Sequence, residues 1–256
     1  MADPYASKAR RARLRLAGIG AATVVALVVG GVVALTAFDD HSQPSQSDAK
    51  PSRSPSAGPS ASSSSGKQFT PATAARIPLL RPAKSANGIG TGFEHSSLGA
   101  TSAAVSYWED LDLLDDVIAR KQWTAIAAED YPQTVDEGVS EVRKVREGVG
   151  LPPSGGTPDG VTFSTNVKAA LTRSLDSSGD VVVVWMVYDR FAAIRGKGAD
   201  ESPLRDEVTY LVLKWQADDW KVTTDPSYAK KLTGPHAYDP DSPYAFMDGW
   251  REVADG

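Results

Sequence analysis

The sequence predicts an α+β fold in which helices pack on one face of an antiparallel sheet, carried outside the cytoplasm by one membrane helix. Three observations predict it. An apolar segment of 22 residues lies near the N-terminus, residues 96–149 repeat apolar side chains at helical spacing, and residues 161–224 alternate or run apolar as strands do. The chain has no cysteine, so its core must stabilise the fold without disulfides.

The apolar segment, residues 17–38, is long enough to span a membrane. It carries no charge, and a helix of that length rises about 33 Å, the thickness of the hydrocarbon core of a bilayer. Five basic residues precede it and Asp39 and Asp40 follow it, which predicts a basic cytoplasmic tail over 1–16 and a single-pass cell-membrane protein. A cleaved signal peptide is the alternative, but its apolar core is shorter and Leu35 occupies a position where cleavage needs a small residue.

Small residues recur at every fourth position of this segment. They are Ala22, Ala26, Gly30 and Ala34. That spacing lets two membrane helices approach closely and predicts self-association into a homo-oligomer. An Ala- and Gly-rich span also produces such a row by chance, and the sequence does not decide between the two.

Residues 39–87 form the predicted linker. More than half of residues 41–67 are Ser or Pro, so this tract has little apolar surface to bury and we expect it to be disordered. Residues 69–92 contain Pro71, Pro78 and Pro82, which predict an irregular strap leading onto the domain.

The charge of the outer part limits its partners. Residues 88–256 hold 16 basic and 28 acidic side chains, a net charge of −12. Such a domain repels phosphate backbones, which argues against direct nucleic-acid binding and favours basic or protein partners.

One long helix is expected from Ser96 or Ser97 to Lys121, followed by a short helix over residues 122–129. The long helix is predicted to bury one stripe of side chains, which consists of Tyr107, Leu111, Leu114 and Ile118. The acids between them are Glu109, Asp110, Asp112, Asp115 and Asp116. We interpret these acids as a solvated helix face, with a metal or acid/base cluster as the alternative.

A capping box over residues 134–137 predicts a third helix, which Gly150 ends. Residues 161–175 then alternate, with Val161, Phe163, Val167, Ala169, Leu171 and Leu175 on one face of a strand. The continuous apolar run of residues 181–194 predicts a strand buried on both faces. A third strand over 207–215 turns tightly at residues 217–219 into a fourth.

Two blocks resemble a known family. LVLKWQADDWKVTTD, residues 211–225, resembles the closing hairpin of the nuclear-transport-factor-two-like (cystatin-like) fold. HSSLGATSAAVSYW, residues 95–108, is similar to the opening of extracytoplasmic proteins from actinobacterial mobile elements. Together with the membrane segment they resemble the VirB-type, TcpC-like bitopic subunits of type IV secretion and conjugation machines. The likeness covers residues 88–225 by element order; the long linker and the tail after Asp225 depart from it.

The resemblance implies a cone of helices on a curved sheet and a non-catalytic scaffold that binds other subunits. The alternative is a small-ligand-binding protein, or an isomerase or dehydratase of the same fold, with a pocket inside the cone. An open cone favours this alternative. A cone filled by Trp108, Trp185 and their neighbours favours the scaffold. A sensor is a third hypothesis, but 16 cytoplasmic residues leave no room for an effector domain.

No motif for catalysis, a cofactor or a metal occurs in the sequence. Asp189 and Arg190, late in the buried strand, are the one charged pair expected near a pocket, and an internal ion pair or a frayed strand end explains them better than catalysis. No histidine falls on a predicted core strand.

The tail, residues 226–256, is rich in aromatic side chains. Ser242 and Pro243 predict a short helix there. The tail either packs back on the domain, which we favour, or offers a docking surface built from Tyr238, Tyr244, Phe246 and Trp250.

Overall fold

The computed structural model describes residues 69–196, 200 and 203–254, which form an α+β fold with helices packed on an antiparallel sheet. The predicted membrane segment and most of the linker lie outside these residues. The helices are η1 Pro71–Thr73, α2 Ser97–Asp110, α3 Asp116–Ile126, α4 Gln133–Gly148, α5 Pro226–Ala229 and α6 Pro243–Asp248. The strands are β1 Lys84–Ala86, β2 Ile89–Thr91, β3 Val161–Ser174, β4 Val181–Ile194, β5 Leu204–Gln216, β6 Asp219–Val222 and β7 Arg251–Glu252. No helix in the described ranges is both long and apolar enough to cross a membrane.

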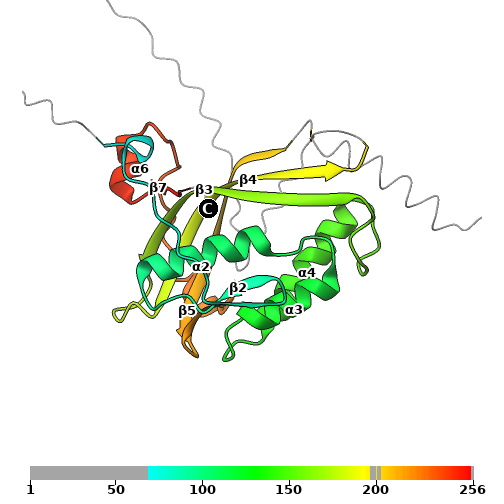
Figure 1. Ribbon diagram of the computed structural model, residues 1–256. Helices are drawn as coiled ribbons and strands as arrows, with labels where there is room; N and C mark the ends of the chain where they lie inside the picture. The colour runs from blue at the N-terminus through cyan, green and yellow to red at the C-terminus, as the bar shows by residue number, and fades with distance from the viewer. Residues whose placement is uncertain (1–68, 197–199, 201–202, 255–256) are drawn as a thin grey trace, which may run out of the picture. The chain divides into compact units, whose positions relative to one another are not determined.

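The main sheet has the strand order β6-β5-β4-β3-β7, and all its neighbours pair antiparallel. Figure 1 shows α2, α3 and α4 together on one side of it. Strand β4 is central and buried on both faces, as its apolar run predicts. Ala217 and Asp218 both have positive φ, 53° and 56°, which is the type I′ geometry of the tight turn expected between β5 and β6.

The expected long helix is two helices, which corrects the sequence prediction. Ser96 caps α2 as predicted, but the helix ends at Asp110, and Asp112 accepts hydrogen bonds from the backbone N–H groups of Leu114 and Asp115. Asp115 then caps α3. Short acidic side chains compete for the backbone in this way and break helices. The prediction of a short helix over 122–129 is therefore also wrong, because α3 already includes residue 122.

The break changes the predicted stripe and the predicted acidic face. Ile118 is 41% exposed instead of buried, because α3 runs on a new axis. Asp116 is only 3% exposed, so it does not belong to a solvated helix face.

The predicted capping box of α4 does not form. Pro132 is the N-cap residue, and the Thr134 hydroxyl instead lies 3.0 Å from that of Thr224 and accepts a hydrogen bond from its N–H. The contact with Thr224, which is distant in the sequence, takes the place of the local contact of the predicted capping box. The helix ends as predicted, with Gly150 at φ 77° donating its N–H to Glu147.

A bulge divides β3 into two halves that face opposite ways. The register against β4 shifts between Val167 and Ala169. Val167 packs under the helices, whereas Ala169 and Leu171 pack against the C-terminal segment and Ala170 takes the helix side. One extra residue moves every later side chain to the other face, so the predicted single apolar face of this strand is wrong beyond Val167.

The strap differs from the irregular segment expected. Its residues 84–91 form a two-stranded hairpin, β1 and β2, whose turn is Asn87-Gly88 with φ of 55° and 81°. Ile77 bridges to Val253 beside β7, so the first described residues and the last ones lie together. Figure 1 shows the start of the described chain next to α6 and β7.

The C-terminal segment packs back on the sheet, as favoured from the sequence. Ser242 caps α6, and β7 adds to the edge of β3. Trp250 is fully buried against Leu171 and Val187 and donates its indole N–H to the carbonyl of His236 at 2.9 Å. This cluster lies on the face of the sheet opposite the helices, so the sheet is covered on both sides.

Candidate functional site

An open groove of about 490 Å³ lies beside the helices. It lies where the end of α2 and the loop of residues 111–115 face the first residues of β3. Its apolar lining consists of Leu111, Leu113, Leu114, Ile118, Val161 and Phe163. Its charged lining consists of Glu109, Asp110, Asp112 and Asp115, and none of the described residues that line it is basic. The groove therefore combines apolar walls with uniformly negative charge.

Two of these carboxyl groups are partly desolvated. Burial raises the pKa of Glu109, although its carboxylate accepts the N–H of Val167 at 2.8 Å. Burial also raises the pKa of Asp110, whose carboxylate is 3.1 Å from the hydroxyl of Ser106. A cationic group that entered the groove would pair with these carboxylates and so offset the cost of their desolvation.

Buried polar contacts hold the groove walls in place. The carboxylate of Asp116 accepts the N–H of Gly155 at 2.8 Å and the hydroxyl of Ser154, and it pairs with Arg143 at 3.1 Å. Arg146, only 3% exposed, donates to the carbonyl groups of Leu114, Pro152, Ser154 and Gly156. Both residues tie the loop after α4 to the loop after α2, so the groove is preformed.

Asp116 should make stability depend on pH. The N–H of Gly155 above all, with the hydroxyl of Ser154 and the guanidinium of Arg143, holds its pKa below the ordinary value of 3.8 despite burial. Because the folded-state pKa is the lower one, the stabilisation is present above about pH 4 and is lost as pH falls through the folded-state pKa. We expect Asp116→Asn to lower the free energy of unfolding at pH 7 by about 2–3 kcal/mol and to flatten the acid limb of the melting curve.

Asp136→Asn is the matched control for Asp116→Asn. Asp136 also pairs with an arginine, Arg120, at 2.9 Å, but its side chain is 76% exposed. Its loss should change stability by less than about 1 kcal/mol. Melting curves of the three proteins between pH 7 and pH 3 measure the difference, and equal losses in both variants would show that Asp116 is not a structural anchor.

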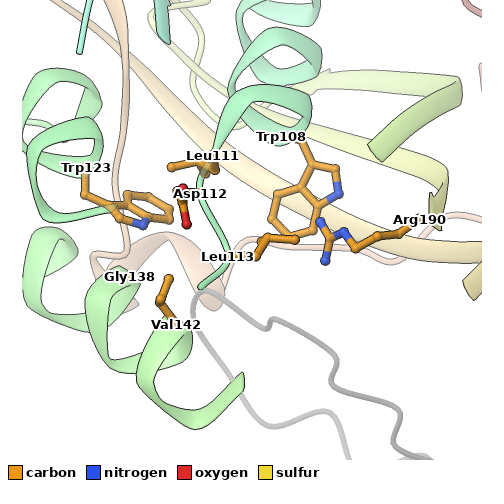
Figure 2. A pocket seen from close by; sticks show the side chains of 8 residues that line it. All are labelled: Trp108, Leu111, Asp112, Leu113, Trp123, Gly138, Val142 and Arg190. Carbon is orange, nitrogen blue, oxygen red and sulfur yellow. The ribbon is translucent and has the colours of Figure 1, made fainter. Parts of the chain in front are cut away.

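The interior between helices and sheet is filled. Trp108 is 3% exposed, and its ring meets that of Tyr188 edge to face with 5.4 Å between the ring centroids. Trp123 fills the other end of this interior space. The cavity left among them is about 20 Å³, room for about one water-sized occupant. Figure 2 shows Trp123 and Trp108 on either side of it. Trp185, which we expected inside, instead lies on the other face of the sheet beside Tyr210.

Asp189 and Arg190 do not pair with each other. The carboxylate of Asp189 forms an ion pair with the ammonium group of Lys168, at the bulge of β3, with an N–O distance of 2.9 Å. It forms a second with the guanidinium of Arg205 at 3.8 Å. Arg190 points to the helix side, where its guanidinium carbon lies 5.3 Å from the ring of Trp108 and 5.0 Å from that of Tyr188. The internal ion pair expected between these two residues therefore does not form, and Asp189 pairs instead with residues that the sequence did not indicate.

The tail residues considered for docking lie in different environments. Tyr244 is 75% exposed on α6, whereas Trp250 has no exposed surface. Phe246 stacks on Phe69 at 5.7 Å and beneath Arg251. Tyr238 meets Trp250 edge to face at 5.5 Å, and burial raises its pKa to about 12. The structure thus keeps Tyr244 as an accessible contact and uses Trp250 as a core residue.

Ala22, Ala26, Gly30 and Ala34 lie outside the described residues. Among the residues that the structure does describe, no group of three or more His, Cys, Asp or Glu side chains could hold a metal ion. The acidic groove and the buried Arg146 are the features that sequence reasoning missed. The run of acids over 109–116 was a usable signal for the groove, but nothing local marks Arg146 as buried.

No protein-family model matches this chain, and no curated protein and no solved structure matches it either.

Proposed function

We propose that this chain is a membrane-anchored extracytoplasmic scaffold or assembly subunit that acts by protein contacts in a conjugation or type IV secretion-like apparatus. The single-span anchor and the family resemblance in residues 95–108 and 211–225 motivate this assignment. On this proposal the α+β domain holds a partner protein outside the cell, and residues 17–38 keep it at the membrane.

The observation that supports this proposal best is the filled space between the helices and the sheet of the α+β domain. Pockets for small-molecule substrates enclose several hundred Å³, roughly 300–1,000 Å³. The cavity between the helices and the sheet measures about 20 Å³ because Trp108, Trp123 and Leu111 occupy the space. This favours a protein-binding domain over an isomerase, a dehydratase or a small-ligand binder that works inside the cone.

The open groove is the contact surface that the geometry favours. Its apolar walls and its four carboxylates suit a Lys- or Arg-rich amphipathic segment of a partner protein, because such a segment buries apolar side chains and neutralises the rim. The net charge of −12 over residues 88–256 would also attract a basic partner from a distance.

Crosslinking in intact cells tests this proposal. The chain has no cysteine, so Ile118→Cys creates a unique attachment point for a photoactivatable crosslinker inside the groove. We expect a crosslink to a basic segment of another envelope protein, identified by peptide sequencing. Adding Asp112→Asn and Asp115→Asn should reduce its yield several-fold.

Val117→Cys is the matched control. Val117 is 56% exposed and precedes Ile118 on α3, but it does not line the groove. Equal yields from both positions would contradict a specific site. A crosslink from Ile118 to residues 39–87 would show that this chain's own linker, from the same or a second copy, occupies the groove, and it would overturn the proposed partner.

A further inference from the structure

The first half of strand β3 has an open edge that borders the groove. Strand β7 covers this edge of β3 only farther along, where it pairs with Ala169 and Ala170. Among the described residues no strand pairs with the same edge over residues 161–166. Phe163 and Thr165, from this part of β3, line the groove. The groove is therefore bordered by an unpaired strand edge as well as by carboxylates.

The pairing of β3 with β4 shows which backbone groups point out of the sheet at this edge. The N–H of Arg195 donates to the carbonyl of Gly160 at 2.7 Å, so Gly160 faces β4. The N–H and C=O groups of successive strand residues point to alternate sides, and the register against β4 is unbroken over this part of β3. Ser164 therefore faces β4, as Gly160 does. Phe163 and Thr165 direct their N–H and C=O groups away from it.

The next outward residue shows how such a group is satisfied. The N–H of Val167 donates to the carboxylate of Glu109 at 2.8 Å. That oxygen takes the place in which a neighbouring strand would put a carbonyl. At Phe163 and Thr165 no group in the described part of the chain does the same. Unpaired edge groups of this kind are a template on which another chain can add as a strand.

The charge beside the open edge selects the chain that can add there. Four carboxylates line the same groove, those of Glu109, Asp110, Asp112 and Asp115. Two copies of this protein that paired edge to edge would bring these carboxylates together, and like charges across an interface repel. A basic segment of another protein would instead pair with them. Charge complementarity therefore favours a basic partner over a second copy.

We infer that the basic partner segment binds as an extended strand, which adds to β3 along Phe163 and Thr165. The inference rests on the proposed function, because it states the conformation in which the partner occupies the groove. Backbone hydrogen bonds to the two outward residues hold the segment, and its cationic and apolar side chains at alternate positions give selectivity. A helical segment would leave the outward N–H and C=O groups of β3 unbonded.

Hydrogen exchange of the full chain in detergent tests the inference. The probe is a heptapeptide of alternating lysine and valine with acetylated and amidated ends. Saturating peptide should slow exchange of the Phe163 and Thr165 amides by at least about tenfold, because both become hydrogen-bonded. The amide of Ser164 already donates to β4 and should not change. Unchanged exchange at Phe163 and Thr165 with peptide bound would overturn the inference. So would slow exchange at both before peptide is added, because the chain itself would then cover the edge.

Two proline variants locate the binding. Thr165→Pro removes an outward N–H and no bond to β4, which a sheet edge tolerates, and it should weaken peptide binding at least about tenfold. Val208→Pro is the matched control. Val208 is 49% exposed and lies on β5 beyond the part that β6 covers. Its N–H points away from β4, as that of Val212 does, whose carbonyl accepts the N–H of Thr223. Val208→Pro should bind the peptide as the unaltered protein does.

The outcomes separate this inference from the proposed function. Suppose that Thr165→Pro binds the peptide unchanged while Asp112→Asn with Asp115→Asn weakens binding. The groove then holds a basic segment in another conformation, so strand addition is wrong and the proposed function stands. Binding that is absent, or that survives the loss of both carboxylates, would contradict the groove as a contact surface and the proposed function with it.

Discussion

Replacing Trp250 by alanine is expected to lower the free energy of unfolding by about 3–5 kcal/mol. Trp250 has no exposed surface, fills the space over Leu171 and Val187, and donates its indole N–H to the carbonyl of His236. The substitution leaves a cavity between the C-terminal segment and the sheet. Chemical denaturation of the purified chain measures the loss.

Tyr244→Ala is the control for this prediction. Tyr244 belongs to the same segment, but it is 75% exposed, so its loss should change stability by less than about 0.5 kcal/mol. If the two variants had the same stability, the C-terminal segment would not be part of the core, and a docking role for Trp250 would return.

Gly138→Ala should destabilise the protein by about 2–3 kcal/mol, although alanine is the better helix former by about 1 kcal/mol. Trp123 lies directly on Gly138, and a Cβ there would come well inside 3.0 Å of the rigid indole ring. Either α3 or α4 must shift, and both border the groove or the filled interior. Thermal unfolding measures the change.

Gly148→Ala provides a control of opposite sign in the same helix. A Cβ at Gly148 meets nothing within 4 Å, so the substitution should stabilise α4 by up to about 1 kcal/mol. If Gly138→Ala were also stabilising, Trp123 would have room to move, and the interior would be less tightly filled than the structure indicates.

Much of the fold could be predicted because its signals are local. The apolar run of β4, the Ser96 cap, the stop at Gly150 and the turn at residues 217–218 each follow from neighbouring residues. Periodicity and turn chemistry report such features well.

Two of the errors arose where a contact distant in sequence accompanies a departure from the local pattern. Thr134 leaves its capping box to bind Thr224, which is 90 residues away. The bulge at Lys168 coincides with its pairing to Asp189 and Asp206, and it reverses the later half of β3. Apolar and polar residues alternate in the same way before and after a bulge. The sequence therefore does not show that the side chains change faces of the sheet there.

The candidate site was visible only in part. The acids around Asp112 stood out, but their effect on the backbone turns a predicted helix face into a loop and a groove. Arg190 was singled out for its charge, but consecutive side chains of a strand point to opposite faces of a sheet, so Arg190 packs against Trp108 while Asp189 pairs with Lys168.

All contacts proposed for the groove require that the α+β domain lies outside the cytoplasm. Labelling of single cysteines by a membrane-impermeant maleimide tests this directly, because the chain has no cysteine of its own. Ser177→Cys, in the exposed turn after β3, should react in intact cells, whereas Ser7→Cys should react only after lysis. If Ser177→Cys were protected until lysis, the membrane-anchored scaffold would be contradicted.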